Sequence, residues 1–253
     1  MNTLLYYEIC FIISIILTLT YIYLWHDGID VTMTCLFVLL PIVNLGCVWM
    51  FWAPTLEIAI LANKIVYLAG CFWPPLATKA ILSLCRLKIK KIYTMLAFIL
   101  SMVFYAFALM TDRSTPLYRS ISYEIVDGRY ELYPEYGWMH TVIYAVMALY
   151  IVIGIIALVY AMKNVVRASI KNMWIMLIGE IVTVVVFFIY GMQKLAGSPA
   201  ILYVVSLLIF LIAGYRSYYY DIDASVMDTM VTEGKMGYLT FDKKINVCSD
   251  ATK

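Results

Sequence analysis

The stretch IAILANKIVYLAGCFWPPLATKAILSLC, residues 58–85, is the longest of seven largely apolar runs and decides the class of fold. A helix rises about 1.5 Å per residue, so about 20 apolar residues cross the hydrocarbon core of a bilayer. Backbone polar groups have no water there, which restricts spanning segments to helices and closed barrels. The stretch therefore predicts a transmembrane helix, in which Pro74 and Pro75 remove two backbone donors.

Six further runs of this kind predict an all-α membrane protein, a bundle of seven transmembrane helices. Of the 253 residues 64% are hydrophobic and 13% are charged, about half of the roughly 25% that soluble domains carry. The expected partner is thus the lipid bilayer, and the expected location is the cell membrane. No basic stripe interleaved with aromatics indicates a nucleic-acid partner. The six further predicted spans are residues 4–25, 33–52, 92–111, 140–162, 173–192 and 199–215.

Basic residues near the span ends predict the orientation, because they collect on the cytoplasmic side. With the amino terminus outside, the inner segments hold more of them than the outer segments. We therefore expect an outer amino terminus and a cytoplasmic carboxyl terminus. The inner set is Arg86, Lys88, Lys90, Lys91, Lys163, Arg167, Lys171 and Arg216, and the outer set is Arg113, Arg119, Arg129 and Lys194.

The outer segment between the fourth and fifth spans predicts a small β-hairpin. Its runs 121–126 and 129–133 are rich in β-branched and aromatic residues, and Asp127-Gly128 between them suits a two-residue turn. The segment also carries many amphipathic rings, which either rest on lipid headgroups or line the mouth of a ligand site. The candidate outer aromatic site comprises Tyr123, Tyr130, Tyr133, Tyr136 and Trp138, with Tyr118 nearby.

Ionisable and amide side chains within the spans are the other candidates for function, because polar groups at membrane depth are costly. Glu180 and Lys79 lie at similar depths from the inner end of their spans, which suggests an ion pair between them. Asn44 is placed to form an interhelical hydrogen bond, and Lys64 to extend toward the headgroups. These four residues are either packing contacts or a ligand or proton site.

The chain changes character after Arg216. Ile222, Val226 and Met230 recur every four residues and predict a short amphipathic helix over 217–233. The segments GYLTFD and INVCSD within 234–253 then predict two strands of a hairpin. Because a lone hairpin is marginal in water, these strands are expected to open a domain that is cut off here.

Three motifs carry a resemblance to a known class of protein. They are NKIVYLAGCFWPPLATKAILSL at 63–84, EYGWMHTVIYAVMALY at 135–150 and VMDTMVTEGKMGYLTFDKKINVCSDATK at 226–253. Residues 1–216 resemble the amino-terminal seven-helix sensory region of bacterial histidine kinases and diguanylate cyclases. Residues 217–233 look like the signalling helix that follows it, and 234–253 resemble the start of a PAS domain. Cys248-Ser249-Asp250 depart from the pattern usual after the second PAS strand.

The resemblance implies a sensory input module that responds to an unidentified small ligand or other stimulus and passes it through the last helix to a cytoplasmic PAS and output module. The fold expected is thus a seven-helix bundle with an outer β-hairpin and a truncated cytoplasmic PAS-like β segment. A homodimer would form through the missing output module, and no catalytic residue, cofactor or metal ligand is expected in this chain. The alternative is a stand-alone multi-pass membrane protein such as a small-molecule transporter, although no duplication is evident.

Overall fold

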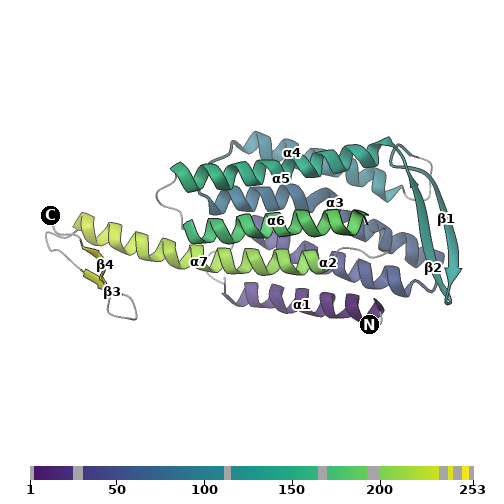
Figure 1. Cartoon of the computed structure of the whole chain (residues 1–253), viewed down its shortest axis with the longest axis horizontal. Helices are drawn as coiled ribbons and strands as arrows, with labels where there is room; N and C mark the ends of the chain where they lie inside the picture. Colours follow the sequence, from purple (N-terminus) through teal and green to yellow (C-terminus); the bar gives the residue numbers. More distant parts are fainter. Residues whose placement is uncertain are drawn as a thin grey trace.

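A computed structural model describes residues 3–24, 31–110, 115–164, 170–192, 200–233, 239–241 and 247–250. Seven helices occur in these ranges, each at the position of a predicted apolar run. The amino-terminal end of α1 and the hairpin β1–β2 lie at one end of the bundle, and the carboxyl terminus lies beyond the other (Figure 1). The helices are α1 (Thr3–Leu24), α2 (Val31–Trp52), α3 (Leu56–Leu84), α4 (Lys91–Leu109), α5 (Trp138–Asn164), α6 (Ile170–Met192) and α7 (Ala200–Glu233).

Six helices in the described part of the chain are long and apolar enough to cross a membrane: α1 to α5, and the Ala200–Ser217 part of α7. Large apolar side chains on their outer surfaces are exposed, among them Leu19, Met102 and Ile156, each at 60% or more. Such a surface suits lipid better than water. The prediction of an apolar helical membrane protein is confirmed at this level, with six such helices in place of the seven predicted spans.

The helices are arranged as a ring with one helix outside it. Around the ring α1, α2, α3, α5, α6 and α7 each pack against the next, and α7 returns to α1. Helix α7 also contacts α2 and α3 across the bundle, whereas α4 packs against α3. The main core is correspondingly built from all six ring helices, with Leu36, Leu40, Leu158 and Leu207 fully buried.

The predicted hairpin is present as β1 (Tyr118–Val126) and β2 (Arg129–Tyr136), paired antiparallel and longer at both outer ends than the sequence suggested. Asp127 and Gly128 have φ of 51° and 77°, which is the conformation of a type I′ turn. The backbone N–H of Tyr130 donates to Ala53 O at 2.9 Å, which ties the hairpin to the segment between α2 and α3.

The tail follows the sequence prediction in outline. Helix α7 continues without interruption to Glu233, and β3 (Leu239–Phe241) pairs antiparallel with β4 (Val247–Asp250). The predicted tail helix 217–233 is thus the second half of α7 rather than a separate element.

Gly137 joins β2 to α5 at a position where no side chain fits. A Cβ there would lie 2.2 Å from the backbone oxygen of Pro116, and the Gly137 N–H itself donates to Leu117 O at 2.8 Å. We expect Gly137→Ala to destabilise the protein by about 1–3 kcal/mol, the usual cost of overpacking. The measurement is thermal unfolding of the purified protein in one detergent. Gly70→Ala is the control, because nothing lies within 4 Å of its added Cβ; equal midpoints for the two variants would contradict the prediction.

Candidate functional site

Glu180 is the most unusual buried residue of the bundle. It lies in the middle of α6 and is only 9% exposed. It lines two cavities of about 10 Å³ each, one bounded by α3, α5 and α6 and the other by α3, α6 and α7. A carboxyl group therefore lies between two small spaces, at the junction of four helices.

The carboxyl of Glu180 has no hydrogen-bond or ion-pair partner among the described residues. In particular, the predicted ion pair with Lys79 is wrong. Thr78, the neighbour of Lys79, lines the cavity beside Glu180 instead. Successive side chains on a helix are rotated by about 100°, so the side chain of Lys79 leaves the α3 surface at a different angle although its depth matches.

Three polar neighbours of Glu180 donate hydrogen bonds to another turn or helix. Thr78 Oγ1 donates to Tyr150 O at 3.1 Å, and Thr183 Oγ1 donates to Gly179 O at 2.9 Å. Trp73 Nε1 donates to Ser206 Oγ at 3.2 Å. Ser206 accepts that bond, donates to no described residue and lines the same cavity as Glu180.

Helix α7 is attached to three other helices at three levels. Near its start the backbone N–H of Ile201 donates to the hydroxyl of Tyr6 on α1 at 3.1 Å. At mid-depth Ser206 bonds Trp73 of α3.

The third level lies where α7 leaves the bundle and involves α6. Asn172 Nδ2 donates to Ala213 O at 3.3 Å, and Arg216 Nε donates to Asn172 Oδ1 at 2.7 Å. Polar contacts between membrane helices are directional and few, so these attachments define how α7 packs against α1, α3 and α6 in this arrangement.

The other two intramembrane candidates lie apart from the Glu180 cavities. Asn44 is fully buried, and its Nδ2 donates to Cys10 O of α1 at 3.5 Å, which confirms the predicted interhelical hydrogen bond. Its Oδ1 has no partner. Lys64 is half-buried and lines neither cavity. The four candidates therefore do not form one site.

The outer aromatic residues are divided between the surface and an anchor beneath the hairpin. Tyr123, Tyr136 and Trp138 are 51%, 42% and 63% exposed, and the ring of Tyr136 also stacks on His140 with ring centroids 3.7 Å apart. Tyr118 is fully buried and its hydroxyl accepts from Asn63 Nδ2 at 3.0 Å. Tyr118 was expected close to the candidate aromatic residues, but no pattern in the sequence indicated Asn63, which lies 55 positions before it.

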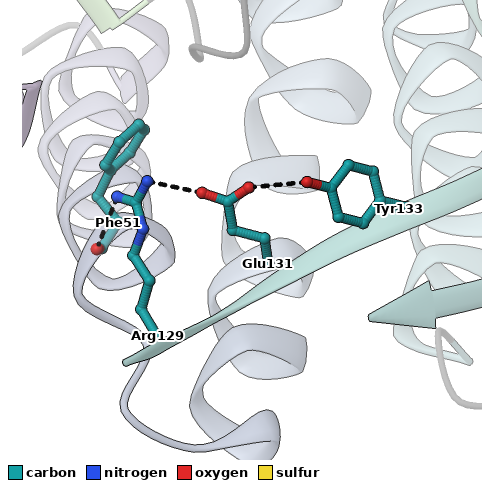
Figure 2. A network of polar contacts seen from close by, with 4 residues as sticks. All are labelled: Phe51, Arg129, Glu131 and Tyr133. Carbon is teal, nitrogen blue, oxygen red and sulfur yellow. Dashed lines mark hydrogen bonds and ion pairs between the residues drawn. The ribbon is translucent and has the colours of Figure 1, made fainter. Parts of the chain in front are cut away.

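The remaining aromatic candidates belong to a polar network on β2. Figure 2 shows the Glu131 carboxylate between Arg129 and Tyr133: Arg129 Nη2 pairs with it at 2.6 Å and Tyr133 OH donates to it at 3.0 Å. The Arg129 guanidinium also lies over the ring of Phe51, 4.6 Å from its centroid. The Glu131 hydrogen bond raises the pKa of Tyr133 above its ordinary value. The network of Arg129, Glu131 and Tyr133 fastens the hairpin to the end of α2.

Tyr130, the other candidate on β2, contacts Tyr123, with ring centroids 5.8 Å apart.

Among the described residues, no group of three or more His, Cys, Asp or Glu side chains could hold a metal ion. Comparison with protein-family models finds no match, and no curated protein is detectably similar in sequence.

The anchor beneath the hairpin has a direct test. Tyr118→Phe removes the oxygen that accepts from the buried Asn63 amide, and a buried donor left without a partner costs about 1–3 kcal/mol. We expect faster amide hydrogen exchange throughout β1 and β2. Tyr123→Phe, the same change at an exposed position of β1, should leave the exchange unchanged; identical profiles for the two variants would show that the Asn63 contact does not hold the hairpin.

Proposed function

We propose that the chain is a membrane-embedded sensory input module that passes a stimulus through α7 to a cytoplasmic PAS-like and output module. The observation that carries the proposal is the length of α7. Its 34 residues extend about 51 Å, against a hydrocarbon core of about 30 Å. The helix thus belongs to the bundle in its first half and continues well beyond it to β3 and β4 (Figure 1).

Such a helix can transmit a displacement, because its buried part and its projecting part are one rigid element. A stimulus shifts the equilibrium between two helix arrangements only if it binds them unequally. The attachments of α7 to Tyr6, Trp73 and Asn172 are the contacts that would change between the two arrangements. In this proposal the β3–β4 hairpin is the start of the PAS-like domain.

A transporter is supported less well. An organic solute needs a continuous passage or a binding cavity of hundreds of cubic ångströms. The cavities beside Glu180 measure about 10 Å³ each, which suits one water molecule at most. Uptake of organic solutes by proteoliposomes that contain the full chain would favour the transporter over the sensor.

The signalling role predicts a dependence on helical phase. One to four residues inserted after Tyr220 rotate everything downstream by about 100° each. With a diguanylate cyclase module joined after Lys253, cyclase activity should rise and fall with the number of inserted residues. The same insertions after Lys243, between β3 and β4, keep the phase of α7 and serve as controls. Cyclase activity that does not depend on the number of residues inserted after Tyr220 would contradict transmission through α7.

The topology is part of the same proposal. We propose that α6 also crosses the membrane and brings the number of spans to seven. The amino terminus is then outside and the carboxyl terminus in the cytoplasm. Alkaline phosphatase, active only outside, and a fluorescent protein that matures only in the cytoplasm report the side when fused to either end. We expect phosphatase activity at the amino terminus and fluorescence at the carboxyl terminus. Both ends on one side would mean an even number of crossings.

A further inference from the structure

We propose that Glu180 is a proton-binding site, hydrated by a series of small cavities along α3, and that its protonation acts on α7 through Ser206. The site itself stands on the geometry described above, whereas its action on α7 rests on the proposed function. The Glu180 side chain is nine-tenths buried, faces two cavities and lacks any described counterion.

A proton is the ligand that this environment favours. A carboxylate transferred from water into an apolar interior must be paired, or it must be neutralised by a proton. Among the described residues that line the two cavities, the only other titratable side chain is Tyr150 of α5, and none is cationic. Helix α3 contributes Trp73 and Thr78, and α7 contributes Ser206. The space of about 10 Å³ on each side excludes an organic ligand.

A third cavity extends this interior space toward the hairpin end of α3. It is also about 10 Å³ and is lined by Gly70, Cys71, Pro74, Pro75 and Tyr150, with Ser101 of α4. It shares Pro74 and Tyr150 with the first Glu180 cavity, and that cavity shares Ile81 and Glu180 with the second. The three spaces thus adjoin one another from α4 to α7.

The polar atoms that could hold water in the third cavity are a consequence of the proline pair. Pro74 and Pro75 have no backbone N–H to donate to the carbonyls of Gly70 and Cys71, four residues earlier. Those carbonyls can accept from water, and a buried water needs two to four polar partners. A single water in each cavity would give protons a way to reach Glu180 by short steps.

The effect on α7 follows from the position of Ser206. Its hydroxyl lines the same cavity as Glu180 and has its hydrogen available, while its oxygen already accepts from Trp73. A charged carboxylate attracts that hydroxyl, directly or through the water, whereas a protonated carboxyl can donate in return. The protonation state therefore changes the contact at the middle attachment of α7.

Infrared difference spectroscopy on the full chain in lipid nanodiscs tests the site without any signalling readout. Between mildly alkaline and mildly acidic buffer, the wild type should gain the carbonyl-stretch band of a protonated carboxyl in an apolar environment. Glu180→Gln should lose this band and Glu180→Asp should keep it at a shifted frequency. Glu124→Gln, the same change at an exposed position of β1, should retain it. A band that persists in Glu180→Gln would overturn the assignment. So would a band that disappears from the wild type when sodium is added at constant pH.

Two further variants test the surroundings and keep the proposal open to refutation if Glu180→Gln does not fold. Ser206→Ala should shift the frequency of the band, because it removes the neighbouring hydroxyl. Gly70→Leu should fill the third cavity and slow the hydrogen–deuterium exchange of the carboxyl several-fold, with Gly70→Ala as the smaller control. An unshifted band in Ser206→Ala would refute the contact with α7. Equal exchange rates in the two Gly70 variants would refute the water path.

Cyclase activity of the fusion, measured against pH and against the insertions after Tyr220, separates the proton site from the signalling role. If the infrared band is present and the activity depends on the insertions but not on pH, the proton site stands and its action on α7 is refuted. If activity ignores the insertions as well, the proposed function fails and the proton site remains. Cyclase activity that changes with pH in the wild type and not in Glu180→Gln supports both.

Discussion

The interior of this bundle is largely apolar, and that constraint governs its structure. Each polar group between the helices needs a partner within the protein, because an unsatisfied one costs several kcal/mol in an apolar medium. Trp73 is hydrogen-bonded to Ser206, Thr78 to a backbone oxygen of α5, and Asn172 to both Ala213 and Arg216. Among these neighbours, the Glu180 carboxyl has no such partner in the described part of the chain.

Helix α3 is the element on which most of the other contacts depend. It packs against α2, α4, α5 and α7, and it also touches the hairpin through β2. Near the hairpin it supplies Asn63 to the anchor, and from Gly70 onward it supplies one wall of all three cavities. Pro74 and Pro75 lie within this wall. A change at the hairpin and a change at Glu180 therefore act on the same helix.

Local pattern in the sequence predicted the elements, and it failed where partners are distant. Apolar runs placed every helix, and Asp127-Gly128 placed the turn, because each depends on neighbouring residues alone. The contacts of Tyr118 with Asn63 and of Trp73 with Ser206 join positions 55 and 133 residues apart, which no local pattern encodes. The wrong pairing of Glu180 with Lys79 has the same origin, since depth along a helix does not give the direction in which a side chain points.

The arrangement of α7 explains why a small local change at Glu180 could matter at a distance. A helix attached at its start by Tyr6 and at its exit by Asn172 and Arg216 cannot shift freely, but it can pivot or rotate about these points. Ser206 lies between them, so in the proposed mechanism a force there acts on the buried half of α7. Because the projecting half is continuous with the buried half, a rotation at Ser206 reappears at Glu233 without further contacts. The coupling then requires only that two packings of the middle attachment differ by a few kcal/mol.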